Sequence, residues 1–84
     1  MTPEEIRSIL LEGLENAEVQ ADGDGSHFQV IAVSEQFEGQ RSVKRQQAIY
    51  ALLGDKITSG ELHALSIKTY TPSEWEKAKH LQVG

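Results

Sequence analysis

The sequence predicts an α+β fold, one domain with three helices and three strands in the order αββαβα. The same helix-start motif occurs twice, at residues 2–5 (TPEE) and 71–74 (TPSE). Each is a helix capping box with proline at the first helical position. Between them, two strand-like runs flank a Gly/Asp turn, and a helical pattern leads to a third strand-like run. Eighty-four residues leave no room for a second core, so residues 1–84 are expected to form a single domain.

The first half of the chain predicts a helix followed by a β-hairpin. Apolar residues recur at helical spacing from Thr2 onward and indicate an amphipathic helix that ends near Asn16. Residues 17–21 and 27–34 are the first two predicted strands. Residues 22–26 (DGDGS) lie between them, and Asp-Gly steps tolerate the positive φ angles of hairpin turns.

The second half predicts a loop, a helix, a strand and a short last helix. Residues 37–40 form the loop, and the strand over 62–70 precedes a helix that begins at Thr71 and directs Trp75 inward. Because a helix links the last two strands, they are expected to be parallel and joined by a right-handed crossover. The middle helix has a face marked by Val43, Gln47, Tyr50, Leu53 and Ile57, and Gly54 is a candidate break in it.

Composition excludes several classes of function. Eight basic against thirteen acidic residues give a net charge of −5, which disfavours a general nucleic-acid coat or a binder of anionic membranes. The absence of cysteine excludes disulfides, a thiol nucleophile and an iron–sulfur site built from this chain alone. No apolar run approaches the roughly 20 residues of a membrane span, so the cytoplasm is the expected location.

The sequence shows no clear set of catalytic residues. Ser26 and His27 are adjacent in sequence, and neighbours on a strand point to opposite faces, so they do not form a nucleophile–base pair. Carboxylates lie on predicted helix faces and caps, and we expect no enzyme activity. The DGDGS turn resembles the start of a calcium loop, with Asp22, Asp24 and Ser26 as oxygen ligands. The remaining positions of the calcium-loop pattern do not match this sequence, and the mismatch favours a solvated hairpin turn.

Two histidines are candidate metal ligands. His27 begins the second strand and His63 lies at the head of the third, in phase with Leu65 and Ile67. If these strands are parallel neighbours, both imidazoles lie at the same end of the sheet. Each histidine is either a structural residue at the rim of the core or a ligand, and the pattern alone leaves both interpretations open.

A basic cluster is the other candidate site. Arg41, Lys44 and Arg45 fall within one turn of the middle helix, and Lys68 projects from the third strand. In an acidic chain this local reversal of sign would attract an acidic partner or a phosphate. The alternative is a solvated first turn, although cations at a helix N-terminus oppose the helix dipole.

Several motifs together resemble the BolA family, and most closely its short bacterial branch, the IbaG type. They are GSHFQV at 25–30, Phe37-x-Gly39, Gln47-x-x-Tyr50 and LHALSIKTYT at 62–71 followed by Glu74-Trp75. The resemblance implies an αββαβα fold related to class II KH domains, with a three-stranded mixed sheet and helices packed on one face.

The resemblance also implies a function. BolA-like proteins are partners of monothiol glutaredoxins that carry a Cys-Gly-Phe-Ser motif and, with glutathione, share a [2Fe-2S] cluster. In that arrangement His63 is a cluster ligand. A second ligand comes in many members from the loop between the first two strands, where this chain has Asp24, with His27 as the nearest imidazole.

Coordination chemistry agrees with that arrangement. A [2Fe-2S] cluster normally takes four thiolates, and a chain without cysteine supplies only nitrogen or oxygen ligands to a cluster whose thiolates arrive with a partner. The rival hypothesis is a DNA-binding transcriptional regulator with a KH-like fold, although no two glycines stand three apart, so the Gly-x-x-Gly loop of KH domains is absent. By itself the chain is expected to be a monomer or a weak homodimer.

Overall fold

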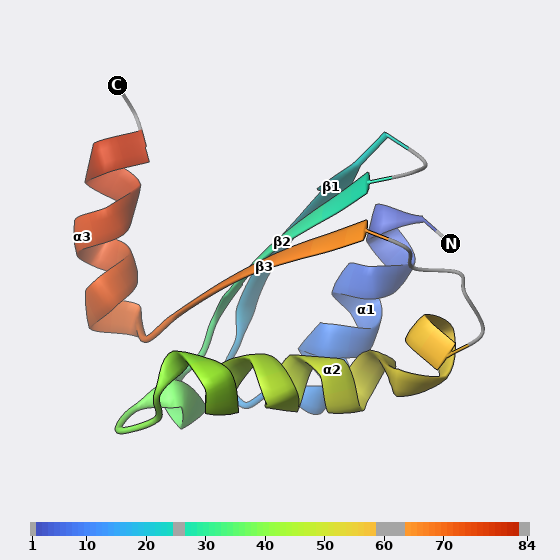
Figure 1. Cartoon of the computed structure of the whole chain (residues 1–84). Coiled ribbons are helices and arrows are strands. Elements are labelled where there is room, and N and C mark those ends of the chain that lie inside the picture. The colour runs from blue at the N-terminus through green and yellow to red at the C-terminus, as the bar shows by residue number, and fades with distance from the viewer. Residues whose placement is uncertain (1, 25–26, 59–63, 83–84) are drawn as a thin grey trace.

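The computed structural model describes residues 2–24, 27–58 and 64–82, and it confirms the predicted α+β class and element order (Figure 1). No helix of these residues is long and apolar enough to cross a membrane. A short 3₁₀ helix, η1, is the one element that the sequence patterns did not predict. The elements are α1 (Pro3–Gly13), β1 (Glu18–Gly23), β2 (His27–Val33), η1 (Glu35–Phe37), α2 (Ser42–Thr58), β3 (Ala64–Tyr70) and α3 (Pro72–Gln82).

The three strands form one mixed sheet with β2 in the centre. β1 and β2 are antiparallel, as expected for a hairpin, with Glu18 opposite Val33. β2 and β3 are parallel, with His27 beside Ala64, and α2 lies in the connection between them. The parallel pairing predicted for the last two strands is therefore confirmed.

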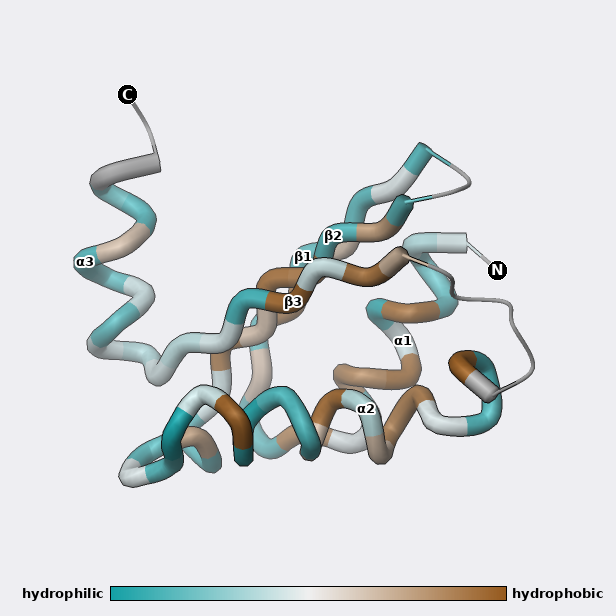
Figure 2. Tube along the Cα trace, in the orientation of Figure 1, coloured by the Kyte–Doolittle hydropathy of each residue, from teal (hydrophilic) through white to brown (hydrophobic). Residues whose placement is uncertain are grey.

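Two helices cover one face of this sheet. α1 packs on β1 and on α2, and α2 also packs on β3. The hydrophobic stretches of the chain gather where the strands face α1 and α2, whereas α3 is mostly hydrophilic and stands beyond the end of β3 (Figures 1 and 2). The predicted packing of helices on one face of the sheet therefore holds for α1 and α2. Among the described residues the core consists of Ile6, Leu10, Leu14, Val19, Phe28, Val30, Ala32, Phe37, Ile49 and Leu53.

The capping signals are confirmed at both terminal helices. The Thr2 hydroxyl accepts a hydrogen bond from the Glu5 N–H at 3.2 Å. At α3 the box is reciprocal, because the Thr71 hydroxyl accepts from the Glu74 N–H at 3.2 Å and the Glu74 carboxylate accepts from the Thr71 N–H at 2.9 Å. The first helix ends at Gly13, earlier than expected, and Asn16 in the turn that follows has a φ of 44°, a left-handed conformation that asparagine tolerates better than most residues.

The face of α2 that the sequence pattern marks is buried only in part. Leu53 is buried and Ile57 packs against the core, whereas Val43 is 67% and Tyr50 is 40% exposed. Ile49, which the pattern did not include, is fully buried. Apolar residues occupy two adjacent stripes of this helix, and the helical period does not tell which stripe meets the sheet. The helix also continues through Gly54 without a break.

The loop prediction for residues 37–40 missed a core residue. Phe37 ends η1 and is completely buried. Ser34 precedes η1, accepts a hydrogen bond from the Gln36 N–H at 3.3 Å, and donates its hydroxyl to the Glu15 carbonyl at 2.6 Å. These bonds fix the segment that follows β2 against the segment that follows α1.

Trp75 attaches α3 to the end of the sheet. Its side chain is 9% exposed, and its ring lies 5.2 Å from the Tyr70 ring, centroid to centroid, at a tilted angle. The predicted inward orientation of Trp75 is confirmed. This contact is separate from the core formed by the described residues of α1, α2 and the sheet.

Candidate functional site

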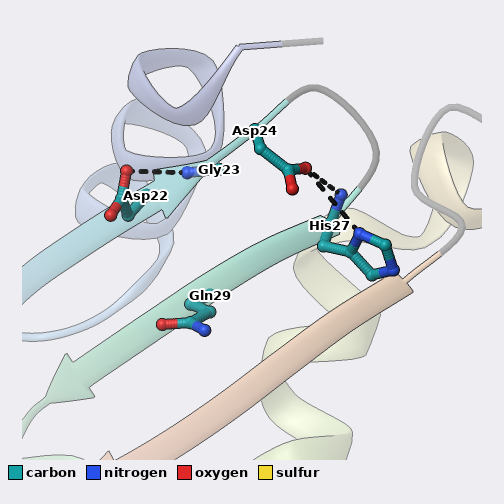
Figure 3. Close-up of a pocket in the computed structure, with 5 residues that line it drawn as sticks. All are labelled: Asp22, Gly23, Asp24, His27 and Gln29. Carbon is teal, nitrogen blue, oxygen red and sulfur yellow. Dashed lines mark hydrogen bonds and ion pairs between the residues drawn. The ribbon is translucent and has the colours of Figure 1, made fainter.

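The first candidate site lies where the β1–β2 hairpin closes. The Asp24 N–H donates to the His27 carbonyl at 3.2 Å, and the His27 N–H donates to the Asp24 carboxylate at 2.8 Å. Asp24 therefore closes the turn with both its backbone and its side chain. The neighbouring Asp22 carboxylate accepts from the Gly23 N–H at 2.9 Å (Figure 3).

The His27 imidazole faces the Asp24 carboxylate. Its Nδ1 lies 3.7 Å from the nearer carboxylate oxygen, which is an ion-pair distance when the ring is protonated and too long for a hydrogen bond. Both side chains are exposed, His27 by 74% and Asp24 by 71%. In a neutral imidazole, a carboxylate on the Nδ1 side selects the tautomer with the proton on Nδ1, which leaves the Nε2 lone pair for a metal ion.

A shallow hollow of about 230 Å³ surrounds these two residues. Figure 3 shows its lining side chains on the two strands of the hairpin and the turn end, with the imidazole beside the start of β3. The lining residues are Asp22, Gly23, Asp24, His27 and Gln29. The hollow is open to solvent, so it suits a ligand that is presented from outside better than an enclosed small molecule.

Of the two predicted histidine ligands, the structure describes one. His63 lies outside the described residues. Ala64, which follows it in the chain, is the first residue of β3 and is paired with His27 on β2. The imidazole of His27 is therefore at the end of the sheet where β3 begins.

The donor set of this site is small. Among the residues that the structure describes, no group of three or more His, Asp or Glu side chains is placed to hold a metal ion, and the chain has no cysteine. The carboxylates of Asp22 and Asp24 both accept hydrogen bonds from the turn itself, in agreement with the hairpin interpretation. Ser26, the third oxygen of the calcium-like pattern, lies outside the described residues. The described part of this site therefore offers one imidazole and two carboxylates as metal donors.

The structure does not place Arg45 in an open basic patch. Its guanidinium makes a two-bonded pair with the Glu74 carboxylate, at 2.7 and 3.3 Å, and its Nε donates to the Gln40 carbonyl at 2.9 Å. The guanidinium also lies 5.9 Å from the centre of the Phe37 ring, and its side chain is only 12% exposed. Arg45 therefore joins α2 to α3, a role that sequence analysis missed because Arg45 and Glu74 are 29 residues apart.

The partner of Arg45 carries a perturbed pKa. The hydrogen bond from Arg45, followed by the one from the Thr71 N–H, holds the pKa of the Glu74 carboxyl below its ordinary value of 4.5. The carboxylate is about half exposed, so solvent weakens the effect.

The other basic residues do not form one surface. Arg41 and Lys44 are exposed at the start of α2. Lys68 is exposed on β3, where alternation puts it on the opposite face from Ile67, which packs against the core. The predicted four-residue cluster is thus reduced to Arg41 and Lys44, with Lys68 on the uncovered face of the sheet.

Comparison with known proteins points to one family. Residues 7–74 match the family model described as BolA-like protein. The acid stress protein IbaG of Escherichia coli K12 is 49% identical over 81 residues, which cover 96% of each chain. The DNA-binding transcriptional regulator BolA of the same organism is 43% identical over 54 residues, which cover 64% of this chain and 50% of BolA.

Solved structures give the same result. A BolA homologue from Coxiella burnetii has a TM-score of 0.79 and 40% identity, covering 90% of this chain and 97% of its own. The BolA domain of SufE1 from Arabidopsis thaliana has a TM-score of 0.76 and 38% identity, covering 86% of this chain and 93% of its own. These structures share the α+β fold described above.

Proposed function

The chain belongs to the BolA family, and on this premise we propose that it is a non-catalytic partner of a monothiol glutaredoxin, to which it supplies a histidine ligand for a shared [2Fe-2S] cluster. His63 is the principal proposed ligand. His27 and Asp24 are the candidates for the second contact. The glutaredoxin cysteine and glutathione provide the thiolates that this chain lacks.

One observation supports the proposal most directly. The His27 imidazole is exposed, has a carboxylate beside its Nδ1, and lies next to the first residue of β3, directly after His63 in the chain. A carboxylate that orients a histidine is the usual outer contact of a metal ligand. A second protein can reach this site, because the hollow around it is open.

Anaerobic reconstitution with a monothiol glutaredoxin and glutathione tests the proposal. Visible absorption and circular dichroism distinguish a mixed cluster with nitrogen ligands from the all-thiolate cluster of the glutaredoxin homodimer. We expect the His63→Ala variant to lose the mixed spectrum while it keeps its fold and still binds the glutaredoxin. If His27 is the second ligand, His27→Ala should weaken the spectrum and Asp24→Asn should weaken it less, because Asp24 then acts only by orienting the ring. If Asp24 is the second ligand, Asp24→Asn should weaken the spectrum and His27→Ala should leave it unchanged.

The control variant is His80→Ala, which removes an exposed imidazole from α3, away from the hairpin. It should leave the mixed spectrum unchanged. An unaltered spectrum in His63→Ala would exclude the proposed ligation. A collapsed fold in that variant, seen as loss of far-ultraviolet circular dichroism, would instead assign His63 a structural role.

The same chemistry connects this site to acid. A protonated imidazole does not bind a metal ion, so acidification should remove the nitrogen-ligated form of the mixed cluster. This agrees with the description of the relative IbaG as an acid stress protein. We therefore include an acid response in the proposed role.

DNA binding is the second candidate function, because the relative BolA is described as a DNA-binding transcriptional regulator. Arg41, directly before α2, and Lys44, in its first turn, are exposed cations, whereas Arg45 is paired with Glu74. Phosphate-driven binding weakens steeply with salt. A steep loss of DNA affinity with salt, abolished in an Arg41→Glu/Lys44→Glu variant, would support this alternative, and salt-independent complex formation with the glutaredoxin would support the first.

A further inference from the structure

The outer surface of α2 carries a row of residues outside the core, and two of its members are large and apolar. Val43, Gln47, Tyr50 and Gly54 follow one another at spacings of four, three and four residues and so lie on one line along the helix. Val43 and Tyr50 are the two large hydrophobic residues that are exposed among the described residues. We call these four residues the α2 stripe.

Gly54 gives the stripe a feature that packing within the chain does not explain. Glycine is unfavourable in the interior of a helix, and Gly54 lies in the interior of α2. A Cβ atom built at Gly54 would meet nothing within 4 Å, so no neighbour in the described chain requires a glycine there. A bare backbone at an open position allows another surface to approach closely.

We propose that the α2 stripe is a self-association surface on which the α2 helix of a second copy packs antiparallel around a two-fold axis. The midpoint between Gln47 and Tyr50 is also the midpoint between Val43 and Gly54. A two-fold axis at that point therefore sets each Val43 against Gly54 of the second copy. The same axis sets each Tyr50 across Gln47 of the second copy.

The charges beside the stripe are complementary in this arrangement. At 100° per residue, Lys44 and Asp55 lie on the same flank of the stripe, and both are exposed. In an antiparallel pair related by this axis, the flank of one helix faces the same flank of the other helix. Along the helix axis, Lys44 of one chain then lies within about half a helical turn of Asp55 of the other. The basic first turn of each helix also comes to lie at the C-terminal end of its partner, where the helix dipole favours cations instead of opposing them.

A contact of this size gives a weak, concentration-dependent dimer rather than an obligate one. One helix pair with two apolar side chains per copy is at the low end of specific interfaces. Sedimentation equilibrium should therefore show a reversible monomer–dimer equilibrium. We expect Tyr50→Ala to raise the dimer dissociation constant by about tenfold or more, because central aromatic residues dominate such contacts.

A charge exchange tests the orientation. Lys44→Glu and Asp55→Lys should each weaken the dimer roughly three- to tenfold, and the double variant Lys44→Glu/Asp55→Lys should recover most of the loss. Lys77→Glu makes the same charge change as Lys44→Glu on an exposed position of α3 and is the matched control. Gly54→Leu adds a side chain where the monomer has open space, so it should block the dimer and leave the monomer folded.

Each result decides the proposal. Weakening by Tyr50→Ala and Gly54→Leu together with recovery in the charge-exchanged double variant would establish the antiparallel pair. Sedimentation as a monomer up to about 1 mM would overturn it, as would a dimer that is indifferent to Tyr50→Ala. Failure of the charge exchange to restore a dimer that Lys44→Glu weakens would refute the antiparallel orientation.

Discussion

The two-bonded pair between Arg45 and Glu74 should decide how firmly α3 is attached. Arg45→Met removes the pair, the bond from its Nε to the Gln40 carbonyl and the contact with the Phe37 ring. The pair contributes about 1 kcal/mol because Glu74 is half exposed, and the other two contacts contribute about 1 kcal/mol each. We therefore expect Arg45→Met to lower the free energy of unfolding by roughly 2–3 kcal/mol.

Glu74→Gln should cost less, about 1 kcal/mol, because the amide oxygen can still accept from the Thr71 N–H. The chain's single tryptophan, Trp75, follows Glu74 directly and is buried against Tyr70, so its fluorescence reports the docking of α3. Urea melts followed by this fluorescence and by far-ultraviolet circular dichroism give both free energies. The double variant should show a coupling of about 1 kcal/mol.

The lowered pKa of Glu74 adds a dependence on pH with a defined sign. Its contribution to stability is fully present above pH 4.5, the ordinary pKa of the group, and is lost as the pH falls through the lowered pKa of the folded state. The wild type and Glu74→Gln share every other carboxylate. The difference between their unfolding free energies as a function of pH therefore isolates Glu74. A coupling near zero, or the same loss of stability between pH 5 and 3 in both proteins, would refute the assignment of Glu74 as the anchor of α3.

Two further predictions concern packing. Trp75→Ala should destabilise the protein by roughly 3 kcal/mol in urea melts. A loss below about 1 kcal/mol would mean that α3 folds without this contact. Gly54→Ala should stabilise the monomer by about 0.5–1 kcal/mol, because the new methyl group enters open space and alanine favours the helix. Gly13→Ala should destabilise it, because its Cβ would clash with the Leu52 side chain, and equal thermal shifts in the two variants would contradict this difference.

Local signals in the sequence predicted the elements of this fold well. The capping boxes at Thr2 and Thr71 and the hairpin pairing of the first two strands each depend on a few adjacent residues, and the helices and the antiparallel pair that they predict form as expected. What failed depends on tertiary packing. The buried side of α2 and the core position of Phe37 are set by the sheet surface they meet, which no local pattern encodes.

The candidate site likewise has a part that the sequence predicted and a part that depends on tertiary packing. The positions of Asp24 and His27 at one end of the sheet followed from strand order, and their mutual contact follows from the short turn between them. Arg45 was assigned to a basic patch because its partner is distant in the chain, and its pairing with Glu74 appears only when α2 and α3 are placed in space.

The mixed sheet has a consequence for the order in which the chain folds. β1 and β2 are joined by a short turn and pair locally, whereas β3 reaches β2 only after α2 and its connections have closed a much longer loop. Closing long loops is the slower event, so β3 and the attached α3 should dock late. His27 therefore acquires its neighbouring strand in the last stage of folding. A ligand that bridges the two strands would mainly slow unfolding and would leave the folding rate nearly unchanged, because contacts formed after the transition state act on the unfolding rate.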